Sequence, residues 1–351
     1  MNIQQLLEIA ITRKASDLHL LTEEIPVLRI DGELITIQGF PKLTEPDLET
    51  LIYPLLTENQ KNLFLRDWEM DIGFELKNKS RFRANIYKQR GSLAAAFRLI
   101  PTLIRSLEQL GLPPAVAKLT ELEQGLVLVT GPTGHGKSTT LASFINQINM
   151  TRNAHIVTVE DPIEYTYPKG KAIISQRELN SDTKSWEDAL KSILREDPDV
   201  ALIGELRDLE SMSSAMTIAE TGHLVFATLH TNSAAQTIDR VIDVFPVGQQ
   251  SQIRTQLAAV IEAVISQRLV PTINPGRVLA AEILFVNSAL RNLIRENKTH
   301  QIDNLIQTSG EFGMVNMETS LALLAKEGKI TTTTAQNYST NPQLMNRLLG
   351  I

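Results

Sequence analysis

The chain of 351 residues contains no cysteine, which excludes disulfide bonds and zinc sites built from thiolates. It has no run of about 18 consecutive apolar residues, the length that a membrane-spanning helix needs. Its first residues lack the apolar core of a secretory signal. We therefore expect a cytoplasmic protein that does not insert directly into a membrane.

Aromatic side chains are also scarce, and acidic residues outnumber basic ones. Aromatic residues make up 5% of the chain, and the formal net charge is −6. Proteins that bind nucleic acid usually carry a basic face, and those that bind single strands add aromatic side chains on which bases stack. The composition therefore argues against a nucleic-acid partner.

The chain does contain a glycine-rich stretch, Gly131-Pro132-Thr133-Gly134-His135-Gly136-Lys137-Ser138, followed by Thr139. An apolar run precedes the stretch and a helical pattern follows it, and the spacing G-x-x-x-x-G-K-[ST] in that context is typical of a P-loop. Glycines let backbone N–H groups approach phosphate oxygens, Lys137 can reach the β- and γ-phosphates, and Ser138 can ligate Mg²⁺. We therefore expect residues 131–139 to bind a nucleoside triphosphate with Mg²⁺.

Residues 1–100 have the pattern of a small α+β domain built around an antiparallel sheet. Helical spacing predicts helices over 2–14 and 45–66. Asp31-Gly32 indicates a tight turn between two strands. Proline and glycine residues mark 101–114 as a linker. Alternating or hairpin-flanking patterns predict strands at 15–20, 27–30, 33–35, 70–75, 81–87 and 92–99.

The second domain, residues 115–351, has strands that are apolar throughout rather than alternating. Continuous apolarity predicts burial on both faces, and helical patterns between the strands predict a largely parallel, doubly wound sheet. The strongest helical pattern covers 249–269, and a helical tail closes the chain. The expected strands are 126–129, 156–159, 200–203, 224–226 and 279–286.

Two of these strands are followed by acidic residues. Ligands of open α/β sheets bind beyond the carboxyl ends of the strands, so Glu205 is expected to hold Mg²⁺ directly or through water, together with Ser138. Glu160 is expected to orient the attacking water. A solvated loop glutamate is the alternative for Glu205, and a helix cap or an ion pair is the alternative for Glu160.

Two histidines bracket the strand 224–226, His223 before it and His230 after it. One of them could hydrogen-bond to the γ-phosphate, although a lone histidine is more often a core or interface residue. Their positions at opposite ends of a strand, with no third ligand nearby, argue against a metal pair.

The first domain carries Arg81, Arg83, Arg90 and Arg98 on or beside its strands. A solvated basic face is the usual meaning of such a cluster. The alternative is that they are arginine fingers. A P-loop site often takes the arginine that neutralises γ-phosphate charge from a neighbouring domain or subunit.

On these motifs the chain resembles the secretion-type hexameric ATPases, and within them the ATPases that retract type IV pili. Residues 289–294, ALRNLI, are similar to the AIRNLI motif of the retraction members. The other shared stretches, besides the P-loop, are Ala15–His19, an Asp box at 160–164, a Walker B at 199–205 and a His box at 221–230.

The resemblance implies a PAS-like N-terminal domain, a RecA-like ATPase domain with C-terminal helices, and a homohexamer with ATP between the two domains. It implies that ATP hydrolysis powers pilus retraction and twitching motility through an inner-membrane platform protein and, indirectly, the pilin filament. The motor would dock at the inner-membrane base of the pilus machine. The implied site residues are Glu160 (catalytic), Glu205 (Walker B), His223 (His box) and, as arginine fingers, Arg83, Arg98 and then Arg81.

The chain departs from the family's pattern at four positions. His135 stands where the family usually has serine, Leu206 replaces methionine, Ala227 replaces glycine and Leu290 replaces isoleucine. The backbone cradle does not need the side chain at 135, so we expect phosphate binding to survive. The imidazole could instead add a pH-dependent contact to phosphate.

Related functions stay open as alternatives. An assembly or secretion ATPase of the same superfamily is expected to carry an extra N-terminal domain and a tetracysteine zinc module, and this chain has no cysteine. An accessory retraction paralogue would have nearly the same motifs. Lys137, Glu160 and Glu205 argue against a nucleotide-gated scaffold without sustained turnover, and the acidic charge argues against a nucleic-acid translocase.

Overall fold

The computed structural model describes residues 2–30, 32–76, 80–100 and 103–351. Tertiary contacts divide the chain into two units. The first comprises Met1–Leu103 and Pro162–Thr166, and the second comprises Ile104–Asp161 and Tyr167–Ile351. Asp31 of the expected turn and Pro101 of the expected linker lie outside the described residues.

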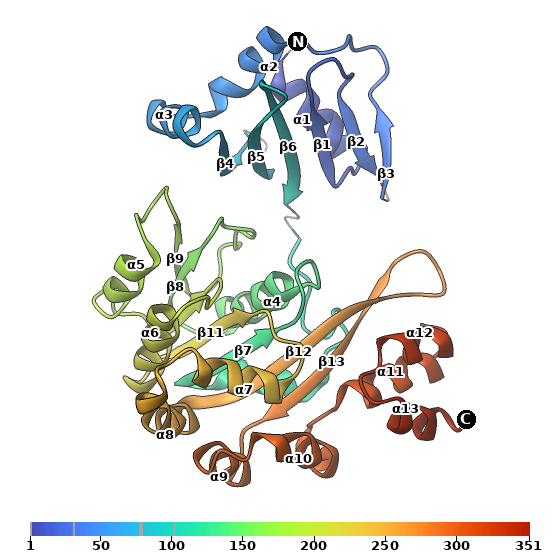
Figure 1. Cartoon of the computed structure of the whole chain (residues 1–351). Helices are drawn as coiled ribbons and strands as arrows, with labels where there is room; N and C mark the ends of the chain where they lie inside the picture. Colours follow the sequence, from blue (N-terminus) through green and yellow to red (C-terminus); the bar gives the residue numbers. More distant parts are fainter. Residues whose placement is uncertain (1, 31, 77–79, 101–102) are drawn as a thin grey trace. The chain divides into compact units, whose positions relative to one another are not determined.

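The first unit is built on a six-stranded sheet with the strand order β3-β2-β1-β6-β5-β4 (Figure 1). All neighbouring strands in it run antiparallel, as the alternating sequence pattern predicts. Helix α1 (Ile3–Thr12) packs its apolar residues into the core of this unit. The strands are β1 (Asp17–Leu20), β2 (Val27–Ile30), β3 (Glu33–Thr36), β4 (Glu69–Glu75), β5 (Arg81–Gln89) and β6 (Ser92–Ile100).

The single helix expected over residues 45–66 is wrong. The structure has two helices there, α2 (Glu45–Ile52) and α3 (Glu58–Asp67). Pro54 lacks the N–H that a continuous helix would need, and Thr57 caps the start of α3. Apolar spacing continues across this break, so periodicity alone does not separate the two helices.

The second unit contains a seven-stranded sheet with the order β13-β12-β7-β11-β10-β8-β9. Neighbouring strands are parallel except for β12 and β13, which form the long hairpin drawn in orange in Figure 1. The predicted RecA-like, largely parallel sheet is confirmed. Its strands are β7 (Gly125–Thr130), β8 (His155–Glu160), β9 (Ile173–Glu178), β10 (Val200–Ile203), β11 (Leu224–Leu229), β12 (Ile261–Pro271) and β13 (Arg277–Phe285).

Helices cover both faces of this sheet, which explains the continuous apolarity of its strands. Alternate residues of β7 enter different cores, Leu126 and Leu128 on one face and Val127 and Val129 on the other. Helix α4 (Lys137–Thr151) packs in the second of these cores. The first core contains residues of α5 (Trp186–Ile193), α6 (Leu209–Glu220), α7 (Ala234–Asp243), α8 (Gln250–Val260), α9 (Ser288–Arg295) and α10 (Ile302–Thr308).

Residues 104–114, expected to belong to a linker, instead pack into the second unit. Leu107 and Leu112 are buried in the same core as α4. The glycine and prolines of this stretch mark turns and the start of a 3-10 helix, Pro114–Glu121, rather than a free connection. Burial of isolated leucines between turn residues leaves no periodic pattern that the sequence could reveal.

The helix expected over residues 249–269 is wrong in its second half. Helix α8 ends at Val260, and the chain continues as β12 between β7 and β13. A buried apolar run fits a helical period and a doubly buried strand equally well, so only pairing with β7 decides between them. The edge strand β9 is not predicted by the sequence, because its residues are mostly half-buried and partly polar.

Short helices close the chain. They are α11 (Met317–Lys326), α12 (Thr332–Tyr338) and α13 (Pro342–Leu349), and they pack on the β12–β13 hairpin through Val270, Ala280 and Leu321. Within the ranges that the structure describes, no helix combines the length and the apolarity needed to cross a bilayer.

Glu282 of β13 is buried beneath the starts of two helices. The N–H of Ala234, the first residue of α7, donates to its Oε1 at 2.7 Å, and the N–H of Met317, the first residue of α11, also donates to the carboxylate. Burial nevertheless raises the pKa of Glu282 to about 7, and repulsion by Asp303 and Glu318 acts in the same direction.

We expect Glu282→Gln to change how stability depends on pH. An unfolded glutamate ionises near pH 4.5 and the folded one near pH 7, so the native state binds the extra proton between these values. The free energy of unfolding therefore falls as the pH rises through this window, by about 3 kcal/mol at 1.36 kcal/mol per pH unit. The glutamine variant should lack this fall. Urea unfolding between pH 4.5 and 8 measures the difference, and parallel curves for the two proteins would contradict it.

Candidate nucleotide-binding site

The glycine-rich loop joins β7 to α4 at the carboxyl edge of the parallel sheet. Gly131 (φ 141°) and Gly136 (φ 84°) have backbone conformations that favour glycine. A Cβ at Gly131 would lie 2.3 Å from the carbonyl oxygen of Gln267 on β12, so only glycine fits there. Helix α4 begins at Lys137, and its positive N-terminal end follows the loop directly. This arrangement of loop and helix is one that binds phosphate.

Lys137 is held at this loop by backbone oxygens. Its side chain is buried, and its Nζ donates to the carbonyl oxygens of Gly131 at 2.8 Å and Pro132 at 3.1 Å. The same Nζ lies 3.5 Å from Nδ1 of His230. The ammonium group is therefore positioned where a phosphate bound by the loop would meet it.

His230, directly after β11, links Lys137 to Glu205. Its Nε2 lies 3.2 Å from Oε1 of Glu205, and its Nδ1 lies 3.4 Å from Oγ1 of Thr133. Because an ammonium group can only donate, Nδ1 accepts from Lys137 and Nε2–H donates to Glu205. The other oxygen of Glu205 lies 2.9 Å from Arg207. Charged and polar groups thus form one continuous network beside the loop.

Glu160 ends β8, next to the strand that leads to Glu205. Its Oε1 accepts hydrogen bonds from Oγ1 of Thr158 at 2.7 Å and from Nε2 of Gln176 at 3.2 Å. The backbone after β10 passes close by, because a Cβ at Gly204 would lie 3.4 Å from Cα of Glu160. Glu160 and Glu205 therefore follow neighbouring parallel strands at one sheet edge, as the sequence predicts.

His223 lies at the opposite edge of the sheet. It precedes β11, whose first residue pairs with Gly125, whereas Leu229 pairs with Thr130 just before the loop. The two edges are about 20 Å apart, since a strand rises about 3.3 Å per residue. Nδ1 of His223 lies 2.9 Å from the carbonyl oxygen of Ile218 in α6.

The resemblance implies a site role for His223, but within this chain the structure places His223 at the opposite edge of the sheet from Glu160 and Glu205. His230, the other histidine of the His box, lies beside Lys137 and Glu205 instead. A signal for His230 was present in the sequence: residues just after a parallel strand lie at the ligand-binding edge. Like Glu205, His230 follows a strand of the parallel sheet.

His135 bonds to β12. Its Nδ1 accepts the N–H of Leu269 at 3.0 Å, and its carbonyl oxygen accepts from the side chain of Gln267 at 2.8 Å. Burial lowers the pKa of His135, and Arg277, Arg268 and Lys137 lower it further, which favours the neutral ring that this bond requires. The imidazole of His135, which could have contacted phosphate, therefore contacts the strand β12 instead.

The three arginines expected as fingers share one face of the first unit's sheet. Two of them alternate along β5, and Arg83 lies directly opposite Arg98 of β6. The partners of Arg81, Arg83 and Arg98 are the carbonyl oxygen of Ile163 (3.2 Å), the carboxylate of Asp71 (3.5 Å) and the carboxylate of Asp17 (2.9 Å).

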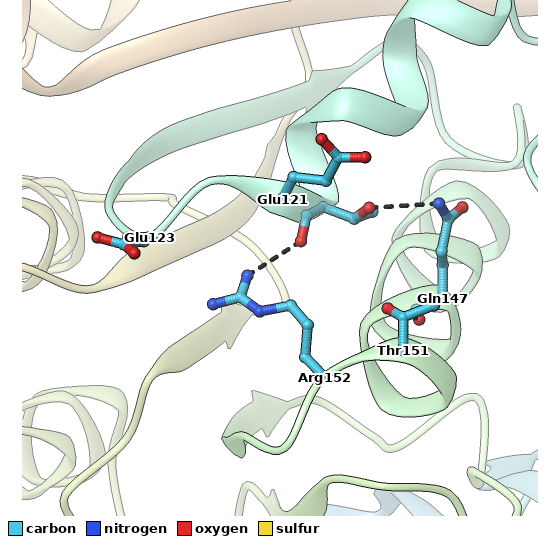
Figure 2. Close-up of a pocket in the computed structure, with 6 residues that line it drawn as sticks. Glu121, Glu123, Gln147, Thr151 and Arg152 are labelled. Atoms are coloured by element: carbon cyan, nitrogen blue, oxygen red, sulfur yellow. Dashed lines mark hydrogen bonds between the residues drawn. The ribbon is translucent and has the colours of Figure 1, made fainter.

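A pocket of about 340 Å³ lies at the other end of α4 from the loop (Figure 2). That end is about 20 Å from the phosphate-binding loop, since a helix rises 1.5 Å per residue. Arg152 donates to two backbone carbonyl oxygens, of Thr120 and Leu122, rather than facing an anion. The pocket is lined by Thr120, Glu121, Glu123, Gln147, Thr151 and Arg152.

Residues 1–276 match the family model described as type II/IV secretion system protein. The chain is 43% identical to the type IV pilus retraction ATPase PilT of Pseudomonas aeruginosa over 343 residues, which cover 98% of this chain and 99% of that protein. It is 46% identical to a twitching motility protein of Neisseria gonorrhoeae over 321 residues, 91% of this chain and 86% of that one. A crystal structure of the pilus retraction motor PilT with bound ADP matches with a TM-score of 0.93 and 46% identity, covering 99% of both chains.

The contacts of His230 lead to a prediction. His230→Ala removes the groups that bridge Lys137 and Glu205, and we expect the turnover of ATP to fall about 10-fold or more, because hydrogen bonds to charged groups contribute about 1.5–3 kcal/mol. His223→Ala is the matched comparison, and its main effect should be a lower melting temperature. Steady-state hydrolysis and thermal unfolding test both. An equal loss of turnover in a His223→Ala protein of unchanged melting temperature would contradict the assignment.

Proposed function

The chain belongs to the type II/IV secretion system protein family, and we propose that it is an ATP-hydrolysing motor that retracts type IV pili and so powers twitching motility. The observation that carries the proposal is the match to a retraction ATPase over nearly the full length of both chains. The matching structure with bound ADP supports a nucleotide at the P-loop.

The site offers a role for each group in phosphoryl transfer. The loop N–H groups and the start of α4 bind the phosphates, and Lys137 neutralises charge on the β- and γ-phosphates. Glu160, oriented by Thr158 and Gln176, accepts a proton from the attacking water or holds that water in line. His230 connects the lysine to Glu205 and so fixes the position of both beside the loop.

The residues present fit a Mg²⁺ ion held mainly by the nucleotide. Ser138 in the first turn of α4 offers a hydroxyl, and Glu205 offers a carboxylate, the oxygen donors that Mg²⁺ prefers. Among the described residues no three His, Cys, Asp or Glu side chains gather as a dedicated metal cage, which suits an ion that takes most of its ligands from phosphate and water. Bound Mg²⁺ would supply charge neutralisation at the phosphates.

Arg81, Arg83 and Arg98, which share one face of the first unit's sheet, are the candidates for arginine fingers. Arg98 pairs at 2.9 Å with Asp17, whose side chain is buried, whereas the contact between Arg83 and Asp71 is 3.5 Å long and partly exposed. Because its ion pair is longer and more exposed, Arg83 can turn more easily toward the negative charge that develops on the phosphates. We therefore rank Arg83 above Arg98 and Arg81 as the arginine finger.

The motor would work as a homohexamer that docks at the inner-membrane base of the pilus machine. There the platform protein would transmit its movement to the pilin filament. An assembly or secretion ATPase, an accessory retraction paralogue and a regulatory scaffold without sustained turnover are the alternatives. No nucleic-acid partner is proposed, in line with the net charge of −6.

Deletion of the encoding gene tests whether the motor retracts pili or assembles them. Loss of a retraction motor should leave cells hyperpiliated and unable to twitch, and an allele carrying Lys137→Ala should not restore twitching, because its turnover should fall by at least about 100-fold. Pilus counts and subsurface twitching assays measure this. Bald cells would indicate an assembly motor, and normal twitching would indicate an accessory one. Full rescue by the Lys137→Ala allele would indicate a scaffold.

Arg83→Ala should separate catalysis from binding. If Arg83 stabilises charge that develops in the transition state, kcat should fall by about 10³-fold while the Kd for ADP changes less than about 2-fold. Arg98→Ala is the control, and it should mainly reduce stability because it leaves buried Asp17 without its close partner. A loss for Arg83→Ala confined to ADP affinity or to folding would refute the finger role.

A further inference from the structure

Gln267 is a buried polar residue that belongs to none of the motifs around the P-loop. It lies on β12 and is 1% exposed. Its Nε2 donates to the carbonyl oxygen of His135 at 2.8 Å, and its Oε1 accepts from Oγ1 of Thr140 at 3.0 Å. Both ends of the amide are therefore engaged, one by the glycine-rich loop and one by α4, and this determines which end faces the loop.

The bond to His135 sets the orientation of one peptide group. The C=O of His135 and the N–H of Gly136 belong to the same planar trans peptide and point in opposite directions. Because Gln267 holds the oxygen toward β12, the N–H of Gly136 is directed away from β12 and into the loop. The N–H groups that line a P-loop are the ones that bind phosphate.

The loop itself does not enforce this orientation. Gly134 and Gly136 have positive φ angles of 76° and 84°, and glycine moves between such conformations at low cost. A rotated peptide between His135 and Gly136 would turn a carbonyl oxygen toward the phosphates, which repels them. A second bond, from the N–H of Leu269 to Nδ1 of His135, holds the same residue on the same strand.

We propose that Gln267 is a positioning residue of the phosphate-binding loop: its side-chain amide keeps the His135–Gly136 peptide turned so that the Gly136 N–H binds the nucleotide's phosphates. The inference rests on the proposed nucleotide function. It gives β12 a part in phosphate recognition. This strand comes later in the sequence than β7, β8, β10 and β11, which the motif residues end or follow.

Binding of ADP and of adenosine, measured by titration calorimetry, tests the proposal, because the ratio of the two Kd values isolates what the phosphates contribute. Gln267→Met keeps the length of the side chain and, without adding charge, removes both the donor to His135 and the acceptor from Thr140. We expect the preference for ADP over adenosine to fall about 10-fold, in proportion to one lost hydrogen bond to a charged group, while adenosine affinity changes less than about 2-fold.

Ser266→Ala is the matched control. Ser266 precedes Gln267 on β12, is also buried, and exchanges a hydrogen bond of 2.8 Å with Thr130, so the variant loses a comparable bond without touching the His135 peptide. Its preference for ADP should equal that of the wild type. An unchanged preference in Gln267→Met, or an equal fall in both variants, overturns the proposal.

A second variant covers the case in which Gln267→Met does not fold. Gln267→Leu likewise has no donor for the His135 carbonyl oxygen and adds no charge, so a preference for ADP equal to the wild type's would overturn the proposal. The wild-type measurement separates the two levels of inference. A wild type that binds ADP no better than adenosine contradicts the proposed nucleotide function, whereas a strong preference retained by the variants contradicts only the role of Gln267.

Discussion

The close approach of β12 to the glycine-rich loop is the constraint on which the rest of the site depends. At Gly131 a carbonyl oxygen of the strand fills the space that a side chain would need, and at His135 two hydrogen bonds tie the loop to the same strand. The C-terminal helices pack on the hairpin that β12 forms with β13. One strand therefore contacts both the phosphate-binding loop and the helices at the end of the chain.

The direction of the parallel strands decides which polar groups can act together. Glu160, Glu205 and His230 each end or follow a strand, so they gather with Lys137 at one edge of the sheet. His223 precedes its strand and is excluded from that edge by the length of β11. Of the two histidines in this short motif, His230 therefore contacts Lys137 and Glu205, and His223 contacts α6.

The course of the chain beyond Glu160 links the two units. The chain leaves the second unit after Asp161, contributes Pro162–Thr166 to the first, and returns at Tyr167. Within the first unit the carbonyl oxygen of Ile163 accepts a hydrogen bond from Arg81. Glu160 is therefore two residues away from a segment of the other unit, while its carboxylate is held by Thr158 and Gln176 of its own.

The sequence by itself determined what depends on local chemistry: the P-loop, the antiparallel first sheet, the largely parallel second sheet and the acids that follow its strands. The tertiary structure alone decided the conversion of residues 261–271 from an expected helix into β12 and the packing of residues 104–114 into the second unit. The physical reason is that burial and strand pairing join segments that are far apart in the sequence. A buried apolar run satisfies several local conformations until pairing with β7 decides between them, and isolated leucines between turn residues carry no local pattern.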